Sequence, residues 1–486
     1  MAIHYNRLNK WGKLFGFLVM LFLSIKGYSQ DGYNIELTLT PWKNDKVYLG
    51  YYYGNRKALA DSAMLNESSH AIFSGENPLP GGIYFVVSSR MEILFELLID
   101  KDQHFSIVAD TATMFSGVIF KDSEENKDFQ EYAKFSSSIG REINNIQKRI
   151  ESTQNETEKD MLRAVANSLN DRLVQYRDST VKANPDAFLS LLFKGMTEPK
   201  VPPAEEHPGG RYDTLYAFNY FKSHYWDGIA FDDARLIRTP FFEARLNKYF
   251  DELVSPEPDS IIPEIDYMLL YARTQPEMFQ FLTVFFVQKY VNPKYMGQDA
   301  VFVHLFEKYI NTGMTPFFTD SYREFLDRRA FSLMANLIGK PAPNLEMITA
   351  DGRKLPLYNV NSDFTVVLFW DPTCGHCKEL LPRLDSIYNA KWKNEGVAVY
   401  AVKVGGPEDE WKKMISSHNI QHWIHVYPPE GYEEKEIAAG RPGYRQLYDV
   451  YMTPIMYLLD KDKRIIAKKL TYLQMDDIIN MKKKNP

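Results

Sequence analysis

The chain has 486 residues, which is too long for a single hydrophobic core and indicates about three domains. Apolar residues make up 45% and aromatic residues 14% of the sequence, a composition that excludes bulk disorder. The formal net charge of -6 supplies no basic surface for a polyanion, so we expect no nucleic-acid partner.

Residues 1–29 have the pattern of an export signal. Three basic side chains precede an apolar run over residues 14–25, and two small residues, Gly27 and Ser29, follow it two positions apart. The apolar run is too short to span a bilayer comfortably. We expect cleavage after Ser29 and a location in the periplasm or cell envelope. An uncleaved segment that anchors the chain in the membrane is the alternative.

Residues 30–120 indicate a small antiparallel, β-sandwich-like domain. Short runs rich in β-branched and aromatic residues are separated by turns that contain proline and glycine. We expect strands at residues 35–39, 46–53, 82–87, 93–99 and 105–108.

Residues 121–335 indicate an all-α domain, because apolar residues recur at helical spacing among charged ones. Asn184 and Pro185 favour a helix start. The isolated histidines His224 and His304 are expected to be packing or surface residues, and no catalytic set is evident. We expect helices at residues 142–150, 161–169, 184–193, 241–250, 276–290, 300–309 and 321–337.

Residues 336–486 indicate an α/β domain. Two prolines near its start, Pro341 and Pro343, prevent the preceding helix from continuing. Strands followed by helices, then by a hairpin and a last helix, predict one mixed sheet covered on both faces. We expect strands at residues 364–370, 397–404, 423–427, 455–459 and 464–467, helices at 374–392, 408–417 and 475–481, and an irregular insertion at 428–442. The expected fold class is multidomain: a small antiparallel β domain, an all-α middle domain and a C-terminal α/β domain.

Cys374 and Cys377 are the only cysteines in the chain. A structural disulfide framework needs more cysteines at greater separations, and a tetrahedral zinc site needs further ligands at matching spacing. A bridge across two residues closes almost no loop, so it would stabilise the fold little. We therefore interpret the pair as redox-active, with no metal and no bound cofactor.

Cys374 is expected to be the attacking residue. The nucleophile in thiol–disulfide exchange is the thiolate, and a free cysteine is only slightly ionised at neutral pH. Cys374 follows Pro372 at the expected N-terminus of a helix, where unpaired N–H groups and the helix dipole favour negative charge. His376 adds a positive charge or a hydrogen bond, and Cys377 is placed to resolve the mixed disulfide.

Pro454 directly precedes an expected buried strand, although a proline cannot donate to a sheet ladder. A cis Thr453–Pro454 bond would present the backbone of Thr453 to an extended partner chain, which would pair as an added strand. From these residues alone, an ordinary trans proline at the start of the strand is the alternative.

Three features together resemble the thioredoxin fold. They are the Cys-Gly-His-Cys motif after an apolar strand, Pro382 five residues after the second cysteine, and Thr453-Pro454 before a strand. The opening at residues 339–343 and the later insertion are similar to the extracytoplasmic branch typified by TlpA and ResA.

The resemblance carries implications for single residues. It implies that the Thr453–Pro454 bond is cis, that Pro382 kinks the helix of the cysteine pair, and that Thr453, Pro454 and Trp370 contact the substrate. Upstream, residues 220–242 and 299–304 resemble two bacterial envelope domain families of unknown function.

Two leucines stand where the resembled families carry an acid. Thioredoxins have a buried acid six residues before the first cysteine, here Leu368, and the ResA branch has a glutamate three residues after the second, here Leu380. Glu379 is adjacent but faces differently on a helix. A buried carboxylate assists deprotonation of the resolving thiol, so its absence argues against transferring the kinetics of either family. Lys403 is a further candidate charge, with plain exposure as the alternative.

Three histidines, His418, His422 and His425, are spaced as metal ligands often are. They straddle an expected helix end and an expected strand start, so no single face collects them. We expect no metal site there.

The sequence therefore predicts an exported thiol–disulfide oxidoreductase that acts on protein thiols or disulfides, as a reductase, for example in cytochrome maturation, or as an isomerase. A membrane redox partner is expected, and the oligomeric state is open. One alternative is an envelope protein that binds a partner through residues 30–335 and has an accessory redox domain. The other is a peroxidase of the peroxiredoxin type, which is disfavoured because Asp371 and Val367 stand where those enzymes need Thr or Ser and Pro.

Overall fold

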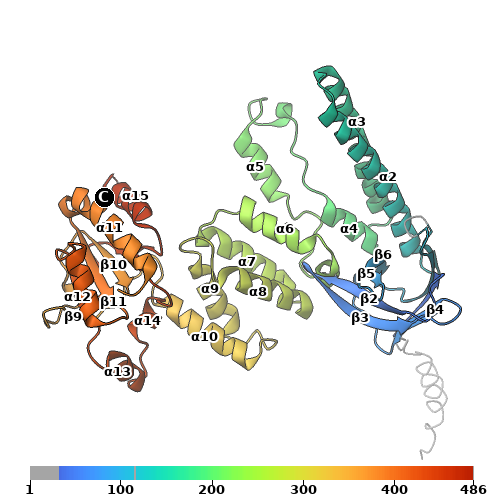
Figure 1. Cartoon of the computed structure of the whole chain (residues 1–486). Coiled ribbons are helices and arrows are strands. Elements are labelled where there is room, and N and C mark those ends of the chain that lie inside the picture. Colours follow the sequence, from blue (N-terminus) through green and yellow to red (C-terminus); the bar gives the residue numbers. More distant parts are fainter. Residues whose placement is uncertain (1–31, 114–116, 485–486) are drawn as a thin grey trace, which may run out of the picture. The chain divides into compact units, whose positions relative to one another are not determined.

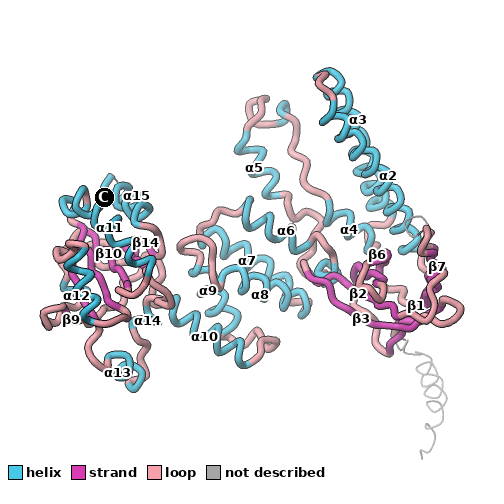
Figure 2. Tube along the Cα trace, in the orientation of Figure 1, coloured by secondary structure: helices cyan, strands magenta, loops and turns pink. Residues whose placement is uncertain are grey.

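The computed structural model describes residues 32–113 and 117–484. The expected export signal and its cleavage site lie outside the described residues. The chain divides into two compact units, with the boundary between Tyr249 and Phe250 (Figures 1 and 2). Within the described residues, no helix is both long enough and apolar enough to cross a membrane.

The described part of the first unit begins with two four-stranded sheets whose inner faces share one apolar core. The strand pairs are antiparallel except for β1 with β7, which run parallel. One sheet has the order β4 (His70–Gly75), β1 (Tyr33–Thr40), β7 (His104–Asp110) and β8 (Ile119–Lys121). The other has the order β3 (Arg56–Met64), β2 (Lys46–Tyr53), β5 (Gly82–Val87) and β6 (Ile93–Ile99).

Sequence patterns did not predict the edge strands β3 and β4. Strand β3 has no fully buried residue, and its run of alanine and charged residues lacks the apolar alternation of a half-buried strand. It forms because its backbone pairs along the whole of β2. Such polar, exposed edges also discourage pairing with other chains.

Two long helices follow the sheets and pack against each other as a hairpin, α2 (Glu124–Ser152) and α3 (Glu156–Ala183). The side chains of Ser123 and Asn155 cap their N-termini by accepting backbone N–H groups. The expectation that Asn184 opens a helix is wrong: Asn184 ends α3, and the next helix begins at Phe188. The remaining helices of this unit are α4 (Phe188–Met196), α5 (Thr214–Ser223) and α6 (Phe242–Lys248).

The second unit begins with helices whose buried residues are mostly apolar, in the region where the sequence predicts helices. The expected helix at residues 276–290 has the same bounds in the structure. The helices are α7 (Pro258–Ala272), α8 (Pro276–Tyr290), α9 (Asp299–Leu305), which continues as the π turn η4 (Phe306–Ile310), and α10 (Asp320–Met334).

The rest of the second unit is built on one mixed sheet of the order β14-β13-β10-β11-β12-β9, all within the described residues 339–484. Strands β10, β11 and β12 run parallel, whereas β13, β14 and β9 pair antiparallel with their neighbours. The strands are β9 (Ile348–Thr349), β10 (Phe364–Trp370), β11 (Val397–Lys403), β12 (Ile424–Tyr427), β13 (Ile455–Leu459) and β14 (Ile465–Lys468).

Both faces of this sheet are buried, because successive residues of β10 point to opposite sides. Val366, Leu368 and Trp370 pack under the helices α11 (Gly375–Ala390), α12 (Glu408–Ser417) and α15 (Tyr472–Lys484). Val367 and Phe369 pack under residues 342–360 and the short helix α14 (Tyr444–Leu447). The predicted multidomain fold class, with its C-terminal α/β sheet covered on both faces, is confirmed.

The predicted irregular insertion at residues 428–442 is only partly irregular. Tyr432–Ala438 form a helix, α13, with Gly431 before it in a left-handed conformation at φ 69°. The glutamates of its first turn suit the positive end of a helix. Proline and glycine at both ends of the segment conceal this helix in the sequence pattern.

Buried polar contacts join α9 and α10 to the C-terminal sheet within the second unit. Lys468, at the end of β14, forms an ion pair with Asp299 and donates hydrogen bonds to the backbone and side-chain oxygens of Asn336. Both charged side chains are about 5% exposed or less. Asp449, also buried, accepts from Arg329 of α10 and from Lys469. Helix α10 is therefore fixed against the loop that leads into β13.

Candidate active site

Cys374 lies between the end of β10 and the start of α11, as its N-cap residue. Asp371 shapes the turn that places it there: its carboxylate accepts the backbone N–H of Thr373 at 2.7 Å, and its carbonyl accepts the N–H of Cys374 at 3.1 Å. The thiol is half-buried, and both cysteines are free thiols. A half-buried thiol at a helix N-terminus is accessible and close to unpaired N–H groups.

The surroundings of Cys374 favour its thiolate. Burial raises the pKa of the thiol, but hydrogen bonding by Thr453 and Cys377 and by the backbone N–H groups of Cys377 and His376 lowers it by more, so the pKa falls below the usual thiol value. The backbone N–H groups of His376 and Cys377 lie in the first turn of α11, where such groups stabilise a negative charge. The attacking role expected for Cys374 matches this environment.

Cys377, one turn further along α11, has the opposite environment. It is fully buried in the core formed with Trp370, Leu381 and Leu384. Burial raises the pKa of its thiol to about 12, and the neighbouring Cys374 adds to the increase. At neutral pH, Cys377 therefore stays protonated while Cys374 is the more acidic thiol.

The loop before β13 faces the attacking thiol. The Thr453–Pro454 bond is cis, as the family resemblance predicts. The Sγ of Cys374 lies 3.3 Å from the carbonyl oxygen of Thr453, 79 residues further along the chain. The structure thus brings together Cys374, Cys377, Thr453 and Pro454 at one place.

Four other candidate residues lie elsewhere or act differently. Trp370 is fully buried in the core, so it does not contact a substrate, and that expectation is wrong. His376 is exposed; its backbone N–H, and not a ring contact, is what reaches Cys374. Pro382 lies inside α11 and is exposed. Lys403, which pairs in register with Trp370, is half-buried near Glu408.

The two leucines that replace the expected acids lie close to the cysteines. Leu368 is fully buried in the same core as Cys377. Leu380 is half-buried and packs against that core. Glu379 is exposed and faces a cavity beside the cysteine pair instead of the resolving thiol. Deprotonation of Cys377 must therefore proceed without a carboxylate at either of these positions.

The three closely spaced histidines have separate partners. His422 bonds to Asp385 at 2.9 Å, His418 to the carbonyl of Met414 at 3.1 Å, and His425 to the carbonyl of Ile420 at 2.8 Å. Burial lowers the pKa of His425 to about 4, so it stays neutral. Over the described residues, no group of three or more His, Cys, Asp or Glu side chains is arranged to hold a metal ion.

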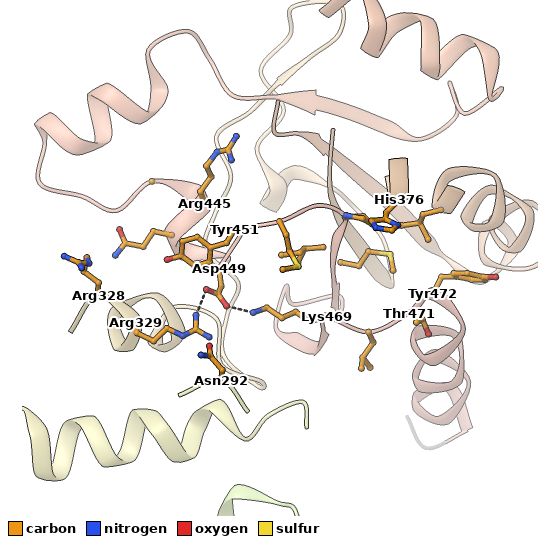
Figure 3. Close-up of a pocket in the computed structure, with 18 of the residues that line it drawn as sticks. Asn292, Arg328, Arg329, His376, Arg445, Asp449, Tyr451, Lys469, Thr471 and Tyr472 are labelled. Carbon is orange, nitrogen blue, oxygen red and sulfur yellow. Dashed lines mark hydrogen bonds and ion pairs between the residues drawn. The ribbon is translucent and has the colours of Figure 1, made fainter. Parts of the chain in front are cut away.

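The cavity beside the cysteine pair has a volume of about 1140 Å³ and lies within the second unit (Figure 3). Helix α11 contributes His376, Glu379 and Arg383, and the loop that faces the thiol contributes Met452 and Pro454. A further wall comes from α10. Sequence patterns did not indicate this wall, because α10 precedes the cysteine pair by about 40 residues and reads as an ordinary amphipathic helix.

The different acidities of the two thiols predict selective alkylation. In the native, reduced protein near neutral pH, iodoacetamide should modify Cys374 alone, with a midpoint in the pH–rate profile below about 8.5, the value of a free cysteine. Intact-mass and peptide mass spectrometry would count and place the adducts. The denatured chain, in which both thiols are exposed, is the control and should take up two. Equal reaction of both thiols in the native protein would contradict the assigned environments.

Two stretches of the chain match protein families. Residues 145–318 match a domain of unknown function, DUF5106, and residues 338–469 match the AhpC/TSA family. The expectation that a domain of unknown function precedes the redox domain is thus confirmed for residues 145–318; a second such domain stays a prediction.

Several proteins are similar to the C-terminal part. The thiol-disulfide oxidoreductase ResA of Bacillus cereus is 24% identical over 131 residues, which cover 27% of this chain and 68% of the relative. ResA of Bacillus anthracis is 23% identical over the same shares. Among solved structures, a domain of a possible thiol-disulfide isomerase from Cytophaga hutchinsonii is 36% identical, with 31% of this chain and 95% of that chain covered and a TM-score of 0.27. A thioredoxin-like protein from Bacteroides caccae is 21% identical, with 59% and 98% covered and a TM-score of 0.45.

Proposed function

We propose that the whole protein exchanges disulfides with exported protein substrates. Its C-terminal part is a thioredoxin-like domain that matches the AhpC/TSA family, and the relatives of this part include thiol-disulfide oxidoreductases. The observation that carries the proposal is the pairing of an accessible, acidified thiol, Cys374, with a buried, protonated thiol, Cys377, opposite the carbonyl of Thr453.

The reaction follows from these two environments. The Cys374 thiolate attacks one sulfur of a substrate disulfide, forms a mixed disulfide and releases the other substrate sulfur as a thiolate, which takes up a proton. Cys377 then loses its proton and attacks Cys374 Sγ, so that the second substrate thiolate leaves and a Cys374–Cys377 disulfide forms. Two electrons pass from the dithiol to the substrate. The reverse sequence oxidises a substrate dithiol.

Substrate binding is proposed to use the backbone beside Pro454. In the reduced protein the carbonyl of Thr453 accepts a hydrogen bond from the Cys374 thiol at 3.3 Å. Ionisation of the thiol removes that donor, so the carbonyl becomes available to pair with an extended substrate segment. Pro382 is proposed to be structural, and His376 to assist Cys374 through its backbone N–H. The pattern of residues 1–29 supports an exported location, either free in the periplasm or anchored. A membrane redox partner is proposed to return the cysteine pair to its starting state after each turnover.

The direction of electron flow is set by the reduction potential. Protein disulfide isomerase has a potential near -180 mV and thioredoxin near -270 mV, a difference of roughly 4 kcal/mol for two electrons. Equilibration of the purified protein with glutathione buffers, followed by mass spectrometry of the alkylated thiols, would measure it. A value near or below that of thioredoxin supports a reductase, for example in cytochrome maturation, and a value near that of the isomerase supports disulfide shuffling.

Hydrogen peroxide should be a poor substrate, although the matched family takes its name partly from peroxide-reducing enzymes. The position three residues before Cys374 is held by Asp371, whose carboxylate accepts hydrogen bonds from Thr373 at 2.7 Å and 2.6 Å. An ionised carboxylate has no hydroxyl to donate to a peroxide oxygen, unlike the Thr or Ser of peroxiredoxins. Stopped-flow tryptophan fluorescence should show peroxide oxidising the dithiol no faster than a free thiol of similar pKa. Oxidation many orders of magnitude faster would favour a peroxidase instead.

A further inference from the structure

The cavity beside Cys374 is shared between two parts of the chain. On one side it is lined by His376 and by Pro454 of the loop that faces the thiol. On the other it is lined by Phe325, Arg328 and Arg329 of α10. Helix α10 precedes residues 338–469, so this wall lies outside the segment that matches the AhpC/TSA family. A substrate that reaches the thiol along this cavity would contact α10 as well.

The α10 wall is held in place by buried contacts. Asp449 is 2% exposed and binds Arg329 of α10 on one side and Lys469 on the other, as Figure 3 shows. Ser332 and Asn336 donate hydrogen bonds to the carbonyls of Gln446 and Leu447. Because a buried charge without its partner is costly, these contacts keep α10 next to the loop of Thr453.

The charged side chains of the cavity give it a positive excess. Five cationic side chains line it, against three carboxylates, and one of the carboxylates, Asp449, is already bound by two of the cations. Arg383 on α11 is exposed and has no ion-pair partner within residues 250–484, all of which are described. Arg328 is paired only with Glu324, and both side chains are more than 60% exposed. These two arginines are therefore available to an incoming anion. The five cations are Arg328, Arg329, Arg383, Arg445 and Lys469, and the carboxylates are Glu379, Glu433 and Asp449.

Large apolar side chains are exposed on the same lining. Tyr451 and Met452 are each 73% exposed and Ile437 is 71% exposed. Exposed apolar side chains that lie together are typical of a surface that binds a partner. Phe325 on α10 is 39% exposed. The cavity volume of about 1140 Å³ exceeds what most small-molecule sites offer, so it suits several residues of a polypeptide.

We propose that this cavity is a specificity site for the redox reaction, that α10 forms one of its walls, and that it selects polypeptide segments with aspartate or glutamate side chains next to the reactive cysteine. Arg328 and Arg383 bind the carboxylates, and the exposed apolar side chains pack against the rest of the segment. The inference rests on the proposed disulfide exchange, because it concerns the choice of substrate for that reaction.

The test compares disulfide-linked peptides that differ only in the charge of the residues beside the cysteine: acidic, neutral and basic. The full-length protein should reduce the acidic peptide with a kcat/KM at least about tenfold above that of the basic one, and the difference should shrink at high salt. In Arg328→Glu and Arg383→Glu the preference should vanish or reverse. Phe325→Ala should raise KM for all three peptides.

Bis(2-hydroxyethyl) disulfide, small and uncharged, separates the choice of substrate from the exchange chemistry itself. Every variant should still reduce it, which shows that the variant is folded and that its cysteine pair is functional. Lys412→Glu is the matched control, since Lys412 is a half-exposed cation of the same unit that does not line the cavity. Turnover of the small disulfide with no charge preference among the peptides would overturn the specificity site alone. Failure to reduce any disulfide would overturn the proposed function, and the specificity site with it.

Discussion

Replacing Cys374 with serine should lower the rate of disulfide exchange by about 10³-fold or more, because a serine hydroxyl is not ionised at neutral pH and forms no mixed disulfide. The reduction of a disulfide-linked peptide, followed by release of its thiols, would measure the loss. The substituted side chain is almost isosteric and half-buried, so the fold should be unaffected.

The matched variant is Cys377→Ser, which keeps the attacking thiol and removes the resolving one. It should complete the first step and accumulate a mixed disulfide, visible by mass spectrometry as one covalently bound substrate per chain. The same variant, expressed in cells, would capture the native substrates. If Cys374→Ser kept more than a few per cent of the activity, or if Cys374→Ser rather than Cys377→Ser accumulated the mixed disulfide, Cys374 would not be the attacking residue.

Removing the carboxylate of Asp299 should destabilise the second unit by about 3–5 kcal/mol, the usual cost of leaving one member of a buried ion pair alone. In Asp299→Ala, Lys468 keeps its two hydrogen bonds to Asn336 but loses its buried counter-charge. Burial already lowers the pKa of Lys468 in spite of Asp299, so loss of that carboxylate leaves the cation still less favourable. Urea unfolding, followed by the fluorescence of the tryptophans in the C-terminal sheet, would measure the loss.

A double variant gives this prediction its control. Asp299→Ala combined with Lys468→Met removes both charges and should recover most of the lost stability, because a buried ion pair is often replaceable by apolar side chains. Glu408→Gln, which breaks an exposed pair with Lys412, should change the unfolding midpoint little. A loss below about 1 kcal/mol in the single variant would mean that water or rearrangement compensates the lysine.

The elements that carry the site could be predicted closely from the sequence. The expected strand 364–370, helix 408–417 and strand 455–459 have the same bounds in β10, α12 and β13. Local patterns suffice here, because a strand buried on both faces is a continuous apolar run and turn residues mark its ends. The cis Thr453–Pro454 bond was accessible only through the family resemblance.

The structural features that could not be predicted from the sequence depend on contacts between residues far apart in the chain. Strand β3 is ordered by pairing with β2 and not by its own apolar pattern. Trp370 is the last residue of the apolar strand β10, and the packing of the helices over this face places it in the core. The arginines of α10 read as an ordinary solvated face; their place beside the cysteines follows from the buried contacts of Asp449 and Lys468. No spacing rule links residues so far apart.

The position of β13 in the sheet has a consequence for how the protein is made. Strand β10 is flanked by β11 on one side and by β13 on the other, yet β13 follows β10 in the sequence only after β11, β12 and four α-helices. As the chain grows from its N-terminus, the two thiols are synthesised well before the segment that covers this side of β10. A chain interrupted ahead of residue 453 thus carries a dithiol beside an open strand edge. An unpaired strand edge is open to pairing with other chains, so synthesis through β13 protects both the edge of β10 and the cysteine pair beside it.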